Sequence, residues 1–305
     1  MWEETRQMTK FATICVVALL GVPTSARAQV CAVSQVTVQI LGSAGPRLDS
    51  ERASASYLLW IDGQARILVD AGGGAYLRFA QSGARLSDLW LLAVSHLHPD
   101  HISGLPALLW LSEQTRQEPL PAAGPSGNDV MPAFPTFLSR LFDQNNGAFQ
   151  ILGGTVGSGG RGVPLDVTVV DVASVEALTL LDRPEMTVTA LGIPHGNIPA
   201  LAYRVQVGEV SIVFSTDQNG TSPAFIEFAR DADVLVMHLA IAGGATSPLH
   251  AAPVVVGRVA RDAGVGRLIL SHIGLFDLES AVAEVKTSYA GPLTVGADLQ
   301  CTPVE

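Results

Sequence analysis

The apolar residues of this chain fall into short runs separated by turn residues, a pattern typical of β-strands. In the first part of the chain, strands are predicted over residues 36–42, 55–62, 65–72 and 89–95. The Asp-Gly pair at 62–63 marks a hairpin between the second and third of these runs. The last run is apolar at nearly every position, as expected for a strand buried on both faces. Residues 71–83 are predicted to form a glycine-rich turn that leads into a helix, and residues 103–114 are predicted to form a second helix.

The second part of the chain repeats this style. Strands are predicted over residues 186–195, 200–208, 210–217, 232–238 and 266–272, and helices over residues 222–231, 251–264 and 278–291. Between the two parts, residues 118–165 are rich in proline and glycine and hold one predicted helix, 136–144. They contain no G-x-x-x-x-G-K-[ST] phosphate loop, so we interpret them as an excursion near the mouth of the site. The two sheet-plus-helix halves predict an α+β fold layered as helix, sheet, sheet, helix.

The composition is that of a globular protein, with 48% of the 305 residues hydrophobic and 15% charged. Residues 1–28 have the layout of a secretory signal peptide, with an apolar stretch at 11–22 and an A-x-A site that ends at Ala28. This stretch is about half of the roughly 20 residues that a membrane span needs. We therefore expect a periplasmic or secreted protein with no stable membrane anchor, in which residues 29–305 form a single domain. An uncleaved N-terminal anchor is the alternative.

Charge and cysteine usage bear on the partners and the compartment. The chain has a net charge of −10, and an acidic protein is not built to hold a long polyanion by bulk charge, so we expect no large nucleic acid as a partner. Two cysteines remain after removal of the leader, Cys31 and Cys301, near the two ends of the mature chain. In an oxidising compartment they are predicted to form a disulfide; two free thiols are the alternative.

Three histidines and one aspartate fall within six positions in HLHPDH, residues 96–101. Such a cluster has no economical packing explanation, whereas histidine and carboxylate together suit zinc or another borderline divalent metal. His96 and His98 are two residues apart, so an extended segment points them the same way. In the turn that follows, Asp100 and His101 are placed to face a second ion.

Further candidates also follow apolar strands. They are His195 after ALGIP, Asp217 after VFST, His238 after LVM and His272 after LILS. Side chains at strand ends can converge at one edge of a sheet, where sites commonly form. Asp217 is the natural candidate to lie between two ions about 3.5–4 Å apart, which can share a hydroxide and hold both oxygens of a displacement.

HLHPDH matches the H-x-H-x-D-H signature of the metallo-β-lactamase superfamily, and the chain resembles that superfamily over essentially its whole mature length. GIPHG, FSTD and LILSHI occur in the superfamily's order, and LGSAG and LVDAGGG look like its opening strands. The resemblance implies an αββα sandwich with a dinuclear centre of two divalent metal ions, usually zinc. Carried over by motif, the ligands are His96, His98 and His195 for the first metal and Asp100, His101 and His272 for the second, with Asp217 as the bridge.

Two of the seven histidines, His238 and His250, are outside this ligand set. They extend the resemblance to the ribonuclease Z-like, phosphodiesterase and arylsulfatase-like branches. ADVLVMHLA resembles their HEAT segment, although Leu239 stands where that segment carries glutamate. SPLHAAPVVVGRVARDAGVGRLILSHI resembles their histidine-containing segment before the last ligand. The resemblance gives His250 a role in protonating a leaving oxygen or holding the transition-state charge; a loop histidine without a role is the alternative. His238 and Asp100 are the further catalytic candidates.

The predicted function is an exported dinuclear-metal hydrolase of small phosphodiesters, such as a cyclic nucleotide, with a metal-bound hydroxide as nucleophile. Transfer-RNA processing is disfavoured because only 21 residues lie between His195 and Asp217, too few for the arm that grips tRNA in many of the relatives. An alkyl or aryl sulfatase of the same fold would use the same metals and the same acid, so it is the main alternative.

Other activities stay open at lower weight. Export suits a β-lactamase, but the commonest zinc subclass has a cysteine ligand where this chain has Asp217. Lactonases share a bridging aspartate with this chain. A metal-binding scaffold is the non-enzyme alternative, and it is disfavoured because no ligand position is missing. The sequence is compatible with a homodimer and has no feature that decides the oligomeric state.

Overall fold

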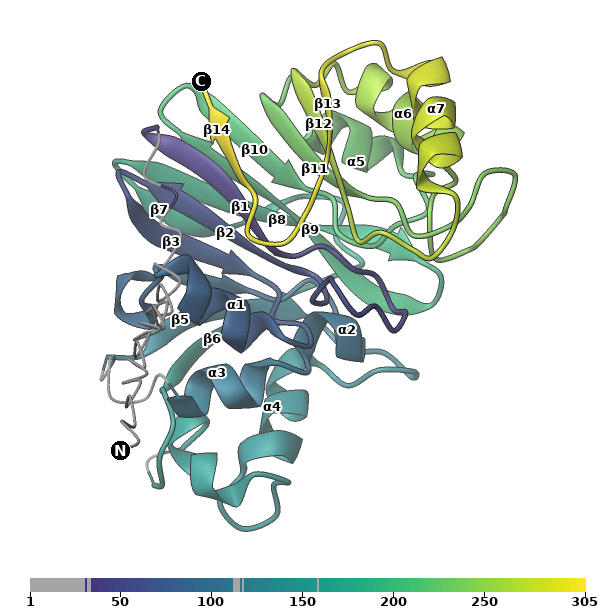
Figure 1. The fold of residues 1–305 in the computed structure, drawn as a ribbon. Coiled ribbons are helices and arrows are strands. Elements are labelled where there is room, and N and C mark those ends of the chain that lie inside the picture. The colour runs from purple at the N-terminus through teal and green to yellow at the C-terminus, as the bar shows by residue number, and fades with distance from the viewer. Residues whose placement is uncertain (1–30, 32–33, 112–115, 117, 158) are drawn as a thin grey trace, which may run out of the picture.

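The computed structural model describes residues 31, 34–111, 116, 118–157 and 159–305. These residues form two seven-stranded sheets with helices on their outer faces (Figure 1). The strand orders are β14-β1-β2-β3-β4-β5-β6 and β13-β12-β11-β10-β9-β8-β7. The predicted signal peptide lies outside the described residues. Within those residues, no helix is long and apolar enough to span a membrane.

The first sheet and its helices come from the N-terminal half and the last strand. Its strands are β1 (Val36–Gly42), β2 (Ser56–Ile61), β3 (Gln64–Val69), β4 (Leu91–Ala93), β5 (Leu120–Pro125), β6 (Leu165–Val170) and β14 (Cys301–Val304). Its helices are α1 (Ala75–Ser82), η1 (Leu86–Asp88), α2 (Pro99–Ile102), α3 (Leu105–Leu111), α4 (Phe134–Phe142) and η2 (Gln150–Thr155). From β3 to β6 the strands pair in parallel, so the carboxyl ends of β3 and β4 lie at the same edge.

The second sheet is built from the C-terminal half. Its strands are β7 (Leu178–Arg183), β8 (Met186–His195), β9 (Ile198–Val207), β10 (Val210–Phe214), β11 (Val234–His238), β12 (Arg267–Ser271) and β13 (Leu293–Val295). Its helices are α5 (Pro223–Phe228), α6 (Pro253–Asp262) and α7 (Leu278–Ser288). The strands β10 to β13 pair in parallel, which brings their carboxyl ends to one edge.

Alternation along the strands builds the layers. Val69 of β3 and Val236 of β11 belong to one apolar cluster that fills the space between the sheets. Their neighbours face outward, because successive side chains of a strand point to opposite faces. Leu68 packs in the cluster under the first helical layer, and Leu235 packs with Val256 of α6 in the cluster under the second. The predicted αββα sandwich is therefore confirmed.

The prediction that residues 118–165 form an excursion with a single helix is wrong in part. β5 lies inside this stretch and pairs in parallel with both β4 and β6. Its sequence, LPAAGP, has two prolines, which normally argue against a central strand because proline donates no ladder hydrogen bond. Five of its six residues are buried, and this burial outweighs the missing donors.

A disulfide joins Cys31 to Cys301, which confirms the predicted pairing of the two cysteines that follow the predicted signal peptide. Their Cα atoms are 5.8 Å apart, and 270 positions separate them in the sequence. Cys301 begins β14, the edge strand that pairs with β1. The disulfide therefore ties the start of the described chain to the edge of the first sheet.

Candidate metal centre

All seven histidines of the chain gather with two aspartates between the carboxyl-terminal edges of the two sheets. His195 ends β8, and His238 ends β11. His272 follows β12 directly, and Asp217 stands three residues after β10. The remaining members come from the segment between β4 and α3 and from the loop before α6; they are His96, His98, Asp100, His101 and His250. The predicted convergence of strand ends at one site is therefore what the fold produces.

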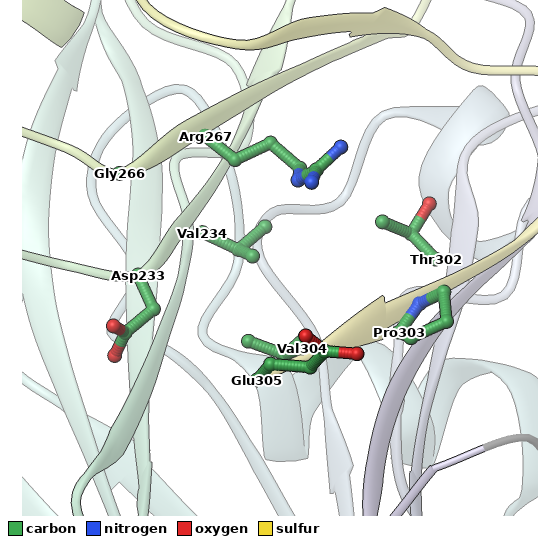
Figure 2. Close-up of a pocket in the computed structure, with 8 residues that line it drawn as sticks. All are labelled: Asp233, Val234, Gly266, Arg267, Thr302, Pro303, Val304 and Glu305. Carbon is green, nitrogen blue, oxygen red and sulfur yellow. The ribbon is translucent and has the colours of Figure 1, made fainter.

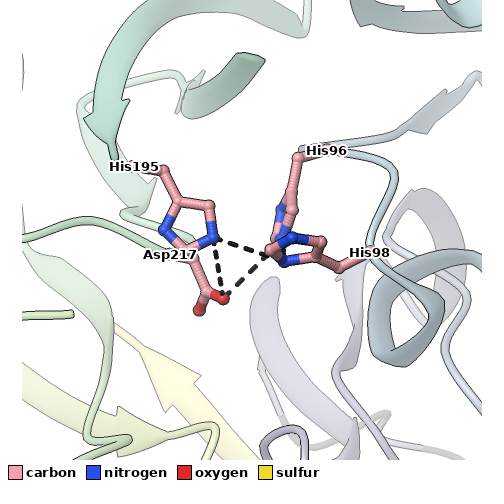
Figure 3. Close-up of side chains that lie close together, drawn as sticks. All are labelled: His96, His98, His195 and Asp217. Atoms are coloured by element: carbon pink, nitrogen blue, oxygen red, sulfur yellow. Dashed lines mark hydrogen bonds and ion pairs between the residues drawn. The ribbon is translucent and has the colours of Figure 1, made fainter. Parts of the chain in front are cut away.

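The first group consists of His96, His98, His195 and Asp217, whose ligand atoms all lie within 4.8 Å of one another (Figure 3). Nδ1 of His98 is 3.0 Å from Nε2 of His96 and 3.4 Å from Nε2 of His195. Both Nε2 atoms are 3.7 Å from Oδ2 of Asp217. Three imidazole nitrogens and one carboxylate oxygen are a donor set suited to zinc.

The second group surrounds the other side of Asp217. Nε2 of His101 is 3.5 Å from Oδ2 of Asp217, and Nε2 of His272 is 3.4 Å from its Oδ1. Asp100 Oδ2 lies 3.1 Å from Nε2 of His272 and 3.7 Å from Nε2 of His101. Nε2 of His101 is buried and has no hydrogen-bond partner among the described residues. A buried nitrogen in this position fits a divalent ion held by these side chains, with Asp217 common to both groups.

Hydrogen bonds behind the histidines fix which ring nitrogen faces the centre. Ser95 gives its hydroxyl hydrogen to Oδ2 of Asp70 at 2.7 Å, so its oxygen accepts from Nδ1–H of His96 at 3.0 Å. His101 donates from Nδ1 to Asp70 at 2.7 Å, and His195 donates from Nδ1 to the carbonyl of Leu249 at 2.8 Å. In its neutral form, each of these three rings therefore presents an Nε2 lone pair to the centre, as metal ligands require.

Asp70 is a functional residue that the sequence reasoning missed. It is fully buried at the end of β3, and it also accepts the backbone N–H of Ser95 at 2.7 Å. Its φ of 57° is in the left-handed region, as are those of Thr216 at 51° and His272 at 52°. Such conformations cost free energy in residues other than glycine and cluster at functional sites. The sequence signal that could have identified Asp70 was its position, because it follows an apolar strand as several of the predicted ligands do.

Burial sets the charge of the first group. It lowers the pKa of His96 well below the usual value and that of His98 below it, and it lowers the pKa of His195 to about 4. These rings are neutral near pH 7, the form of imidazole that binds a metal. Burial alone would raise the pKa of Asp217, but the neighbouring His272 and His101 outweigh it and hold that pKa well below the usual range.

In the second group, His101 favours its protonated form, so a metal ion has to displace that proton. Burial would lower the pKa of His101, but the carboxylates of Asp217 and Asp70 outweigh it and raise that pKa well above the usual value. For Asp100, the hydrogen bond from His272 and the charge of His101 outweigh burial, and the pKa falls to about 2. A divalent cation can replace the proton of a charged ring that lies between ionised carboxylates.

The open side of the centre is marked by the few members that solvent reaches. His98 is half-buried, and the side chains of Asp100 and His250 are each 12% exposed. The ring centroid of His250 is 5.3 Å from that of His195 and 5.6 Å from that of His272, so His250 flanks both groups. His238 is 5% exposed and donates from Nδ1 to Oδ1 of Asp217 at 2.5 Å. A ring nitrogen of His238 also lies within 4.8 Å of ligand atoms of His101, His272 and Asp217, but its Nδ1 hydrogen is given to Asp217. His238 therefore lies behind Asp217, whereas His250 lies on the side that solvent reaches.

A model of the β-lactamase superfamily domain matches residues 65–273. This range is more than half of the chain and contains every predicted ligand. The chain belongs to the β-lactamase superfamily. Membership confirms the predicted family, and with it the class of metal-dependent hydrolases.

Relatives within the superfamily cover most of the chain. Ribonuclease Z of Mycobacterium sp. (strain KMS) is 30% identical over 257 residues, which are 78% of this chain and 84% of that protein. The structure of the metallo-β-lactamase fold protein YhfI from Bacillus subtilis has a TM-score of 0.68 at 20% identity and covers 88% of this chain and 98% of its own. The short form of human tRNase Z (ELAC1) has a TM-score of 0.67 at 19% identity. The match covers 88% of this chain and 99% of the human chain.

These relatives overturn the expectation that no large nucleic acid is a partner. A ribonuclease is 30% identical over most of this superfamily member, so the expectation is wrong. The argument rested on the net charge of −10, which sums over the whole surface. An overall charge does not exclude a nucleic acid that contacts only the site and its surroundings.

A surface groove lies away from this centre (Figure 2). It is lined by Asp233, Gly266, Arg267 and Thr302, among others. Asp233, Gly266 and Arg267 are at the amino-terminal ends of β11 and β12, and Thr302 is on β14. His238 and His272 are at the carboxyl-terminal ends of β11 and β12. The groove contains none of the predicted ligands, so the catalytic argument rests on the histidine and aspartate cluster.

Proposed function

We propose that this superfamily member is a phosphodiesterase that works with two divalent ions, with zinc as the native metal. His96, His98 and His195 would hold the first ion; Asp100, His101 and His272 would hold the second; and Asp217 would serve both. The mixed histidine and carboxylate donor set supports zinc. When bound, two such ions generate a nucleophile near neutral pH and stabilise negative charge at the reacting phosphorus.

The residues of the chain divide the remaining work. Asp70 and the carbonyl of Leu249 orient the His101 and His195 rings through their Nδ1–H groups. Asp100 is ionised and partly exposed, so it can orient the attacking water at the open side of the centre. His250 donates a hydrogen bond or a proton to the leaving oxygen. Burial lowers the pKa of His250, and a neutral ring still has one N–H to donate.

One observation carries the choice of ester hydrolysis, namely the position of His250. Its ring flanks both groups and is partly exposed, which is where a leaving oxygen would emerge. Phosphate, rather than sulfate, is favoured because the relatives that cover most of the chain are named ribonuclease Z. RNA is therefore the first substrate to test, with a cyclic nucleotide as the small-molecule comparison.

A hydrolysis panel with zinc-loaded protein tests this function. It contains a precursor tRNA, a cyclic nucleotide, bis-nitrophenyl phosphate, an aryl sulfate, a lactone and a β-lactam. We expect turnover of the phosphodiesters to exceed turnover of the other three by at least about a hundredfold, the scale of discrimination that a few polar contacts give. Faster turnover of the sulfate, lactone or β-lactam would contradict the proposal.

We also propose that the protein is exported and that residues 1–28 are removed. The disulfide between Cys31 and Cys301 supports an oxidising compartment. Cell fractionation of a bacterium that expresses the full chain should recover the protein outside the cytoplasm, with Gln29 as the first residue. A cytoplasmic protein that retains its leader would contradict this expectation.

A further inference from the structure

A buried tyrosine of the first sheet reaches the site from behind. Tyr57 lies on β2 and is fully buried, and its hydroxyl is 3.0 Å from Nε2 of His238 on β11 of the other sheet. The same hydroxyl is 3.1 Å from Oγ of Ser271. On the far side of the ring, Nδ1 of His238 is 2.5 Å from Oδ1 of Asp217. A continuous chain of polar contacts therefore runs from the core between the sheets to the shared carboxylate.

The direction of these hydrogen bonds follows from what each group can donate. A carboxylate only accepts, so the proton between His238 and Asp217 is on Nδ1 of His238. Nε2 then has a lone pair, and the one hydrogen of the Tyr57 hydroxyl is shared between this nitrogen and Oγ of Ser271.

The chain of contacts limits how the Asp217 carboxylate can rotate. Oδ2 faces the Nε2 atoms of His96, His101 and His195 at 3.5–3.7 Å. Oδ1 is held by His238, so a rotation that moved Oδ2 away would break that bond. The ring of His238 also stacks on that of His272, with centroids 4.5 Å apart and planes 5° apart. Both the bridging candidate and a ligand of the second group are therefore placed by His238.

We propose that Tyr57 is a positioning residue, which through His238 fixes the Asp217 carboxylate and so strengthens binding of the second ion. The inference rests on the proposed function, because it takes the two ligand groups as metal sites. Tyr57 does not touch the centre itself. Its contribution is the hydroxyl, since the aromatic ring belongs to the apolar core between the sheets.

The test compares Tyr57→Phe with Tyr289→Phe. Tyr289 is also buried, and its hydroxyl donates to the carbonyl of Val265 at 3.1 Å, in the cluster under the second helical layer. Zinc affinity is measured for each ion by competition with a chromophoric chelator, and the visible spectrum of the cobalt-substituted protein reports the geometry of the second site. Tyr57→Phe should weaken the second ion by at least about tenfold, as loss of an outer partner of a ligand does. Tyr289→Phe should leave both affinities within about twofold of wild type.

A second variant shows whether the effect passes through His238. His238→Asn keeps an amide nitrogen near Nδ1 but breaks the link to Tyr57, so it should cause a similar loss. Tyr57→Phe should then add no further loss in that background. An additional tenfold loss there would overturn the proposed route, as would wild-type affinity in Tyr57→Phe. If Tyr57→Phe does not fold, wild-type affinity in His238→Asn overturns the proposal.

The two proposals fail in different ways. Wild-type protein that binds two ions and cleaves no phosphodiester would refute the proposed function, whereas a weaker second ion in Tyr57→Phe would still support this inference. Wild-type protein that binds fewer than two ions would refute both.

Discussion

Replacing Asp217 with alanine should abolish hydrolysis and remove one metal equivalent. The carboxylate is 1% exposed and lies 3.4–3.7 Å from ring nitrogens of both groups, so no other side chain can take its place. Its loss also leaves His238 and the two groups of histidines without their shared anion. We expect kcat/KM for a phosphodiester to fall by at least about a thousandfold, the upper range for loss of one transition-state contact.

Asp233→Ala is the matched control for this substitution. Asp233 belongs to the same sheet and accepts from the backbone N–H of Ser211 at 2.7 Å, but it is at the opposite end of β11 from the centre. Asp233→Ala should lower the free energy of unfolding by about 1–3 kcal/mol, because its hydrogen bonds are lost. The variant should keep the kcat/KM and the metal content of the wild type. If the protein were a non-catalytic scaffold, the Asp217→Ala variant would instead keep the function of the wild type.

Removing the ring of His250 should affect substrates according to their leaving group. Nitrophenolate leaves without a proton, so His250→Ala should slow bis-nitrophenyl phosphate only modestly. An alkoxide needs a proton or a hydrogen bond, so cleavage of RNA or of an alkyl phosphodiester should fall by about 10²- to 10⁴-fold. The measurement is kcat/KM for both substrates in wild type and variant. An equal effect on both would remove the assignment of His250 to the leaving oxygen.

The convergence of the candidate site residues could be predicted from sequence because strand topology places them. Asp217, His238 and His272 each follow a short apolar run, and parallel pairing of β10, β11 and β12 brings the ends of those runs together. HLHPDH adds four donors within six residues, which packing alone does not explain. The disulfide was predictable for a simpler reason, since only two cysteines follow the predicted signal peptide.

The supporting residues could not be predicted in the same way. Tyr57 reads as an ordinary core aromatic of a strand, and its contact with His238 joins positions 181 residues apart. The support given by Asp70 depends on a left-handed turn at that residue, for which an aspartate gives no distinctive signal. β5 was missed because its prolines oppose strand formation locally, and only its burial in the assembled sheet outweighs them. Positions of this kind are decided by tertiary contacts rather than by local pattern.

The count of metal ions per chain tests the central claim most directly. Protein purified in metal-free buffer, reconstituted with zinc and freed of excess ions is analysed by mass spectrometry for metal and by amino-acid analysis for protein. The account predicts about two ions per chain in the wild type and one fewer in Asp217→Ala, as expected for two ligand groups that share one carboxylate. One firmly bound ion in the wild type, or none, would contradict the dinuclear centre.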